Sequence, residues 1–318
     1  MQAQGGKKES EMRVLLIGRD SFGKDCLKAL LEQGEDLVGV ITVPDRAGQA
    51  KPNPTKEFGT EAAIPLLLPS ILKDPKVADW VKSRLPELIV LAFVTDIIPK
   101  AIIDIPKYKA INYHPSLLPR YRGGSAINWA IINGEAETGV TIHYIDAGID
   151  TGDIIIQERV PISPEDTVAS LYFKRLYPIG VRMLAETVRM IGEGKAPRIK
   201  QDNSQASYQP VIQEKHVIID FGRSVQNVHN LIRGSNPNPG ATTYLRGKKI
   251  KIWNAQIISE NFIQSRPGEI LQIVPQGIII ASADGCIIAE KLQIEGGKKI
   301  SAVDFVNATE IIVGEIIG

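Results

Sequence analysis

The 318-residue sequence has only two cysteines, no excess of charge of either sign and no long apolar run near its start. Cys26 and Cys286 lie far apart, and neither has a partner at the short spacing of a zinc site. Structural zinc and a disulfide-rich scaffold are therefore excluded, and we expect no metal in this protein. Two isolated cysteines are typical of reduced thiols, which indicates a cytoplasmic protein.

The charged side chains nearly cancel, because 37 lysines and arginines face 36 aspartates and glutamates. No overall field would draw DNA or an anionic membrane to this surface, and a nucleic-acid partner would need a local patch. Residues 1–11 are polar and rich in Lys, Glu and Gly. This composition excludes a secretory signal or membrane anchor there and predicts a disordered tail.

Short apolar runs alternate with helical patterns after the tail. Arg13–Gly18 is followed by a helical pattern over Ser21–Gln33 and by a second apolar run, Leu37–Val43. Two further buried-strand candidates are Leu88–Phe93 and Ala110–His114. The alternation predicts an α/β fold with a doubly wound, mostly parallel, Rossmann-like sheet covered by helices on both faces. Functional side chains are then expected in the loops at the carboxyl ends of the strands.

The chain length predicts two domains. Two more strands, 139–145 and 154–160, precede one long amphipathic helix predicted from Asp166 to Ile191. Residues 193–210 are polar, rich in Gly and Pro and without periodicity, so they are the candidate linker. The expected divisions are the tail, 1–11, an α/β domain, 12–203, and a second domain, 204–318.

The second domain is predicted to be a small β-barrel. A helix is expected over Ser224–Arg233, followed by short strands separated by Gly, Pro, Asn or Asp turns. The five strands are expected at Ala241–Leu245, Lys249–Ile258, Gly268–Val274, Gly277–Ser282 and Cys286–Ile294. Five closely spaced strands suggest a barrel of the oligonucleotide-binding (OB) kind.

The first glycine-bearing turn, Gly18–Gly23, lies where a dinucleotide-binding loop would lie but lacks its fingerprint. The G-x-G-x-x-G pattern requires a second glycine where this sequence has Asp20, and a carboxylate there would repel a phosphate. We therefore interpret the turn as a tight strand-to-helix connection and expect no NAD.

The side chains best suited to catalysis lie between Ile111 and Asp153. Asn112 and His114 are two residues apart at the end of a predicted strand, so their side chains point to the same face. Asp150, in the loop GIDTGD, is the best candidate for a carboxylate that orients the histidine. This set suits acyl transfer: Asn112 and His114 would stabilise the oxygen of a tetrahedral intermediate, while Asp150 tunes His114 and helps to move the proton of the nucleophile.

Each of these residues also has an ordinary structural interpretation. A histidine at a strand end is often a satisfied structural residue, and Asp150 and its neighbour Asp153 are equally typical of turns. His143, His216 and His229 have no comparable neighbours in the sequence, and we interpret them as structural.

The same stretch resembles the signature of the folate-dependent formyltransferases: an Asn-x-His pair, the SLLP segment, an Arg-Gly segment and an aspartate in a DTGD loop. The resemblance extends to VPDRAG at 43–48, EDTVASLY at 165–172 and GEGKAP at 192–197, and covers nearly the whole chain from Met12. It implies a formyltransferase catalytic domain at 12–203, in which the trio acts on the formyl group of 10-formyltetrahydrofolate. It further implies a folate pocket made by Leu91, Ala92, Phe93, Ser116, Leu117, Leu118, Pro119, Asp146, Ala147, Gly148 and Thr151.

The expected acceptor of the formyl group is the amino group of methionyl-tRNA, because a barrel follows the catalytic domain. Water, which would make the protein a hydrolase, and an amino-sugar nucleotide are alternatives, since SAINWAIINGE at 125–135 resembles the hydrolase domain of 10-formyltetrahydrofolate dehydrogenase. A folate-sensing binding protein is the non-enzymatic alternative. An initiator tRNA would need cationic contacts, and the candidates, which an ordinary solvated hairpin also explains, are Arg246, Lys248, Lys249 and Lys251.

Overall fold

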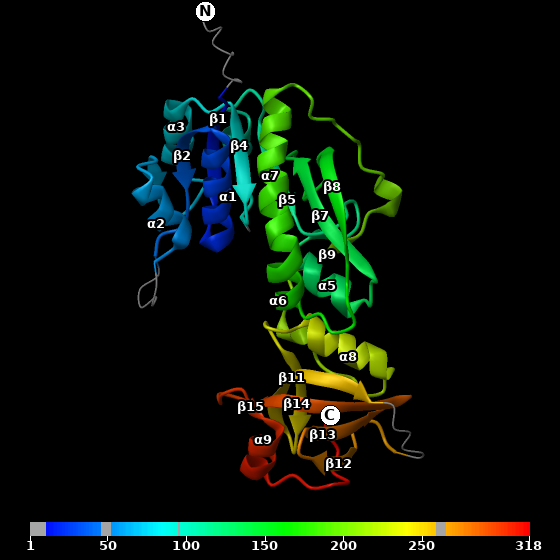
Figure 1. Cartoon of the computed structure of the whole chain (residues 1–318). Helices are drawn as coiled ribbons and strands as arrows, with labels where there is room; N and C mark the ends of the chain where they lie inside the picture. The colour runs from blue at the N-terminus through cyan, green and yellow to red at the C-terminus, as the bar shows by residue number, and fades with distance from the viewer. Residues whose placement is uncertain (1–10, 46–51, 95, 259–264) are drawn as a thin grey trace, which may run out of the picture. The chain divides into compact units, whose positions relative to one another are not determined.

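The computed structural model describes residues 11–45, 52–94, 96–258 and 265–318 (Figure 1). All of the predicted tail except Glu11, and residues 46–48 of the VPDRAG segment, therefore lie outside the described residues. The chain forms two compact units. The first comprises the residues up to Arg122 with Gly139–Arg159 and Leu176–Tyr208, and the second comprises Gly123–Thr138, Val160–Arg175 and Gln209–Gly318. Our division between residues 203 and 204 stays a prediction.

The first unit is organised around a seven-stranded sheet in the order β3-β2-β1-β4-β5-β7-β8. Its strands are β1 (Arg13–Gly18), β2 (Asp36–Ile41), β3 (Leu66–Leu67), β4 (Leu88–Ala92), β5 (Ala110–His114), β7 (Glu137–Tyr144) and β8 (Ile154–Pro161). The five strands from β3 to β5 are parallel, as predicted, whereas β7 pairs antiparallel with β5. The carboxyl end of β5 therefore lies opposite the middle of β7.

Helices cover both faces of this sheet, which confirms the doubly wound prediction. They are α1 (Asp20–Gln33), α2 (Pro54–Glu61), α3 (Pro75–Arg84), α4 (Lys100–Ile103) and α7 (Tyr177–Gly192). Alternate strand residues such as Leu15 and Ile89 pack in one core cluster with Val77 of α3 and Ile102 of α4. The intervening strand residues point to the other face, where α1 and α7 lie side by side in Figure 1.

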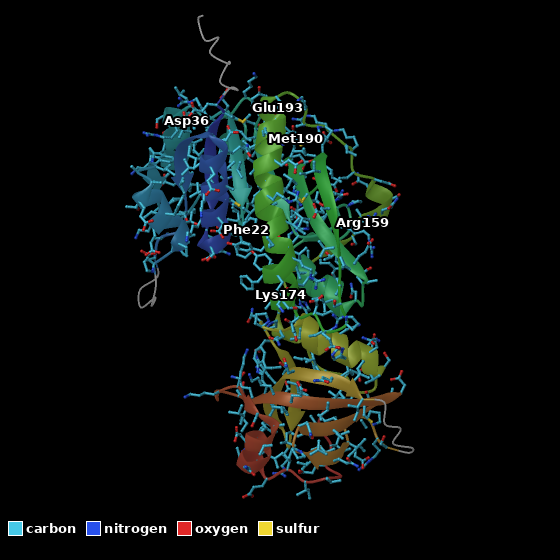
Figure 2. The ribbon with its side chains drawn as sticks, viewed as in Figure 1. Phe22, Asp36, Arg159, Lys174, Met190 and Glu193 are labelled. Atoms are coloured by element: carbon cyan, nitrogen blue, oxygen red, sulfur yellow. The ribbon has the colours of Figure 1, made fainter. Side chains whose placement is uncertain are left out.

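The carboxyl edge of the parallel strands is marked by Phe22, in the first turn of α1. Its ring lies 4.6 Å from that of Tyr113 in β5 and 5.2 Å from that of Tyr177 in α7. Figure 2 shows Phe22 at one edge of the first unit, and Asp36, where β2 begins, at the opposite edge. The edge that carries Phe22 is therefore the one at which functional side chains are expected.

The long helix predicted from Asp166 to Ile191 is interrupted. It begins as α6 (Val168–Leu171), with the Thr167 side chain as its N-cap, continues as a π-helical turn (Tyr172–Leu176) and becomes α7. Pro178 has no N–H to donate and its ring clashes with the carbonyl four residues earlier, so the regular hydrogen-bond ladder cannot run through this region. The amphipathic period was predicted correctly, and the proline accounts for the interruption.

The second unit holds an antiparallel sheet in the order β10-β11-β14-β13-β12, with β15 paired to β14. Residues 315–318 join its two edge strands, because Ile317 bridges Leu245 of β10 and the Ile270 N–H of β12 donates to the Glu315 carbonyl at 2.8 Å. The sheet is thus closed into a small barrel, with Phe305 and Ile287 fully buried in its core. Besides α6, the helices and strands of the second unit include α5 (Ala126–Ile132), α8 (Val225–Gly234), β10 (Ala241–Leu245), β11 (Lys248–Ile258), β12 (Ile270–Val274), β13 (Gly277–Ser282), β14 (Gly285–Ile294), β15 (Ile300–Ser301) and α9 (Ala302–Thr309).

The segment 193–210, predicted as a linker, is held by main-chain hydrogen bonds. Ile199 pairs with Ile154 of β8, and the Arg122 N–H donates to the Ser207 carbonyl at 2.8 Å. The short strands β6 (Arg122–Gly123) and β9 (Tyr208–Gln209) pair with each other. Within the described ranges, no helix is long and apolar enough to cross a membrane.

Candidate active site

The three residues proposed from the sequence meet at the carboxyl edge of the first sheet. Asn112 and His114 come from the end of β5, and Asp150 comes from the loop between β7 and β8. Asp150 Oδ2 lies 3.5 Å from His114 Nδ1, and the Asn112 Nδ2 amide donates to Asp150 Oδ1 at 3.5 Å. His114 is buried and Asn112 is half-buried, so the group is shielded but reachable from solvent.

His143 joins this group, although we interpreted it from the sequence as structural. The antiparallel register places it directly opposite Asn112. Its Nε2 lies 3.3 Å from Asn112 Nδ2 and 3.5 Å from Asp150 Oδ1. The alternation within 139–145 could have put His143 and Thr141 on one face, but the pairing of that strand with β5 was needed to choose the site.

Main-chain carbonyls fix the tautomers of both imidazoles. His114 Nε2 lies 2.7 Å from the Tyr121 carbonyl oxygen, and His143 Nδ1 lies 2.8 Å from its neighbour's carbonyl at Tyr144. Because a carbonyl only accepts, each of these nitrogens carries a hydrogen. The other nitrogens, His114 Nδ1 and His143 Nε2, are directed at Asp150.

Burial dominates the electrostatics of His114. Loss of hydration lowers the pKa of His114 below its ordinary value, and the nearby His143 adds to this, whereas Asp150 and the Tyr121 carbonyl oppose it. The imidazolium form of His114 therefore releases a proton more readily than that of a histidine in water.

The loop that carries Asp150 has backbone conformations that few residue types can adopt. Asp150 has a φ of 53°, in the left-handed region that costs energy for a residue with a side chain. A Cβ on Gly152 would lie 1.7 Å from the Tyr144 carbonyl oxygen, so only glycine fits there. Asp146 steadies the loop by accepting from the Gly148 N–H at 3.0 Å and the Thr151 hydroxyl at 2.5 Å.

The predicted SLLP segment is held by hydrogen bonds and fixes the backbone that leads to the site. Ser116 and Leu118 are buried, and the Ser116 hydroxyl donates to the Arg120 carbonyl at 2.7 Å. The Leu118 N–H donates to the Thr141 hydroxyl at 3.2 Å, and Gln157 Nε2 donates to the Leu118 carbonyl at 2.7 Å. These contacts fix the residues that precede Tyr121, whose carbonyl holds His114; Leu117 is half-buried near Gly139, and Pro119 follows a cis peptide bond.

A cavity of about 520 Å³ opens at the same edge, beyond β1, β2 and β4. Phe93, which follows β4 with a φ of 64°, is the one residue of the predicted folate pocket in its lining. Leu91 and Ala92 are buried within β4, while Asp146, Ala147 and Gly148 are exposed on the loop that carries Asp150. Apolar side chains such as Ile41 line much of the cavity, together with the cations Arg19 and Lys73 and the acidic Asp96.

The four tRNA candidates lie on β11 and on the turn that precedes it, and three of them are in ion pairs. Arg246 pairs with Glu315, and Lys249 and Lys251 both pair with Glu214, at 2.7 and 2.8 Å. These cations hold the pKa of Glu214 at about 2. Lys248 is exposed at the start of β11. Much of the charge of this cluster is thus balanced locally.

The fold and the site together suit an acyl-group transferase, because an amide, an imidazole and a carboxylate meet at the carboxyl edge of the sheet. Among the described residues, no group of three His, Cys, Asp or Glu side chains is arranged to hold a metal ion. The chain belongs to the formyl transferase family. Residues 12–188 match the family described as "Formyl transferase", and residues 211–310 match its "C-terminal domain".

Relatives from several bacteria align along nearly the whole chain. The "Methionyl-tRNA formyltransferase" of Geotalea uraniireducens is 39% identical over 96% of this chain and 98% of its own length. The protein of the same name from Desulforamulus reducens is 38% identical over the same shares. These matches confirm the family resemblance read from the sequence.

Solved structures share the fold. The HypX protein of Aquifex aeolicus in complex with tetrahydrofolic acid is similar with a TM-score of 0.67 at 20% identity, over 96% of this chain and 49% of that chain. An N-formyltransferase from Helicobacter canadensis is similar with a TM-score of 0.68 at 24% identity, over 89% of this chain and 99% of that chain. The fold prediction is confirmed for both parts of the chain.

Proposed function

We propose that this protein transfers the formyl group of 10-formyltetrahydrofolate to the amino group of methionyl-tRNA, in the cytoplasm. The observation that carries the proposal is the meeting of Asn112, His114 and Asp150 at one edge of the sheet, with distances of 3.5 Å from the carboxylate to its two neighbours. The names of the relatives that align over nearly the whole chain support methionyl-tRNA as the acceptor.

The proposed chemistry uses the donors of this group where negative charge develops. Attack by the amine nitrogen on the formyl carbon forms a C–N bond and places negative charge on the formyl oxygen. Asn112 Nδ2–H and, in its protonated form, His114 Nδ1–H stabilise that oxygen. Asp150 and His143 take up the proton that the amine loses, and the group returns a proton to the folate nitrogen when its bond to carbon breaks.

Exposed residues of the predicted folate pocket are proposed to contact the donor. They are Phe93, which follows β4 in the lining of the cavity, and the Asp146–Gly148 part of the loop that carries Asp150. The buried residues of the same prediction, such as Ser116 and Leu118, hold the backbone under the site. We propose that they shape the pocket through the main chain and not through their side chains.

The cavity at the carboxyl ends of β1, β2 and β4 is proposed to receive the end of the acceptor. Its apolar side chains suit an unbranched side chain such as that of methionine, and Arg19 and Lys73 suit the phosphate of a terminal nucleotide. β4 is the direct neighbour of β5, which carries Asn112 and His114. An amino group held there would lie on the same edge as the catalytic group.

Cationic side chains of the barrel are proposed to contact tRNA phosphates. Besides the four candidates named from the sequence, Lys299 lies 3.2 Å from the centre of the Trp253 ring, with Lys251 at 5.9 Å from it. Burial, Lys291 and Lys251 all lower the pKa of Lys299, in that order. Lysines that repel one another are stabilised by a polyanion, which favours a phosphate backbone as the partner.

The deciding experiment measures both products with and without each acceptor. We expect formylmethionyl-tRNA from 10-formyltetrahydrofolate and methionyl-tRNA, and little formate in the absence of tRNA. Formate release at the same rate without tRNA would identify a hydrolase instead, and formylation of an amino-sugar nucleotide alone would identify a sugar transferase. Folate binding without turnover on any acceptor would identify a sensor. Asn112→Ala, with folate affinity retained and turnover lost, is the control for catalysis.

A further inference from the structure

The amide of Gln201 holds the backbone on both sides of the loop residue that follows Asp150. Its Nε2 donates to the Asp150 carbonyl at 2.8 Å and to the Gly152 carbonyl at 2.7 Å. These bonds fix the main chain of Asp150 itself, whose φ of 53° lies in the left-handed region. A residue in such a conformation persists only when its surroundings hold it there.

The guanidinium of Arg122 sets the direction of that amide. Arg122 Nε and Nη2 donate to Gln201 Oε1 at 3.0 and 2.6 Å. Because guanidinium groups only donate, Oε1 must face Arg122 and Nε2 must face the loop. Arg122 is 2% exposed and is itself held by Asn203 Oδ1 at 2.9 Å and by the Tyr208 hydroxyl at 3.3 Å. The amide therefore has one orientation.

The same segment also reaches the partner of His114. Arg122 directly follows Tyr121, whose carbonyl lies 2.7 Å from His114 Nε2. The Tyr121 N–H donates to the Ser207 hydroxyl at 2.8 Å, and the Arg122 N–H donates to the Ser207 carbonyl at 2.8 Å. Gln201 and Ser207 thus hold the loop backbone at Asp150 and the backbone at Tyr121, the partner of His114.

We propose that Gln201 and Arg122 are positioning residues that hold Asp150 against His114 during formyl transfer. Neither residue needs to touch a substrate; they act through the loop carbonyls. The proposal rests on the proposed function, in which Asp150 is catalytic. The segment 193–210, which the sequence indicated only as a linker, thereby gains a role in catalysis, and the side-chain amide of Gln201 carries that role.

The first test compares Gln201→Leu with Gln205→Leu in the full-length chain. Gln205 lies four residues on and donates to the exposed carboxylate of Asp202 at 3.1 Å, away from the loop. We expect Gln201→Leu to lower kcat roughly 10- to 100-fold, because the carboxylate moves out of line, with KM for both substrates within about threefold of the wild type. Gln205→Leu should leave both constants unchanged. An unchanged kcat in Gln201→Leu, or a loss confined to KM, would overturn the proposal.

Gln201→Glu guards against a folding defect in the leucine variant. The carboxylate has nearly the same shape and still accepts from Arg122, but it has no N–H for the Asp150 and Gly152 carbonyls. We expect the kcat loss to persist in a protein that still unfolds cooperatively, because the carboxylate oxygen repels the two loop carbonyls while the contact with Arg122 is kept. Wild-type kcat in this variant would refute the role of the two carbonyl contacts.

The pH profile of kcat gives a readout that a merely structural residue would not move. Asp150 and His143 are the titratable groups that face His114, and the negative charge of Asp150 raises the pKa of His114. If Gln201→Leu lets Asp150 withdraw, the limb of the profile that reports His114 should move to lower pH. A lower kcat with an unmoved limb would show that the loop stayed in place.

A double-mutant cycle separates this proposal from the function on which it rests. In an Asp150→Asn background, Gln201→Leu should lower the residual rate by less than about twofold, because its target is already lost. Equal factors in both backgrounds would mean that Gln201 acts independently of Asp150, which overturns the positioning role alone. If Asp150→Asn itself retained wild-type turnover, the proposed function would fail, whatever Gln201 does.

Discussion

Replacing Gly152 by alanine adds one methyl group where the site loop touches the end of β7. That Cβ would lie 1.7 Å from the Tyr144 carbonyl oxygen and 2.7 Å from its carbon, against about 3.4 Å for an ordinary contact. The loop must therefore move by roughly 1.5 Å or more, because the carbonyl belongs to a strand of the sheet and cannot yield easily.

The displacement has a larger effect on turnover than on folding. Asp150 lies two residues before Gly152, and its carboxylate is 3.5 Å from both Asn112 and His114. A shift of this size removes the contact with both partners. We expect kcat to fall by about 100-fold and the free energy of unfolding to fall by only about 1–3 kcal/mol.

The assay is single-turnover formyl transfer at saturating folate, run beside a thermal unfolding curve. Gly192→Ala is the matched control, since its added methyl would meet only the flexible end of Met12, at 3.2 Å, near the end of α7. This control should keep wild-type turnover and Tm. A folded Gly152→Ala protein with turnover within about threefold of the wild type would refute the reasoning that this loop sets the carboxylate position.

Three further outcomes follow from the structure. His143→Gln should lower kcat about tenfold at constant KM, because the imidazole contacts Asn112 and Asp150; unchanged single-turnover rates would exclude it from the reaction. Burial, and then Arg233, lowers the pKa of His229. As the pH falls, the histidine of the unfolded chain is therefore protonated before that of the folded chain. The free energy of unfolding should be complete above about pH 6.5 and decrease as the pH drops below it. Tm measured from about pH 7.5 to 5.5 should fall less in His229→Gln than in the wild type, and equal slopes would contradict this. Lys299→Gln should weaken tRNA binding and reduce the slope of log K against log salt by about 1, whereas an unchanged slope in filter binding would remove this lysine from the interface.

Local patterns determined most of the elements. The apolar run at Arg13–Gly18 became β1 with the predicted bounds, and the barrel strands lie within a few residues of their predictions. Such elements depend on side-chain periodicity and on glycine or proline at their ends, which are properties of neighbouring residues. The interruption before α7 also has a local cause in Pro178, although the amphipathic pattern alone runs through it.

The residues of the candidate site could be predicted only in part from such local patterns. Asn112 and His114 could be placed on one face because the period of a strand is two residues. Asp150 could be proposed from its loop, but its contact with both residues depends on how the chain returns to the sheet. His143 and Gln201 could not be chosen, since their places follow from the antiparallel register of β7 and from the docking of residues 201–207.

The sequence by itself determined the α/β pattern, the small barrel and the kinds of side chain available for acyl transfer. The tertiary structure alone decided which of the other three histidines joins His114 in the site, how Asp150 is oriented and which of the barrel lysines are paired with acids. The physical reason is that periodicity depends only on residues close together in the sequence, whereas strand register and loop docking depend on contacts between residues far apart along the chain.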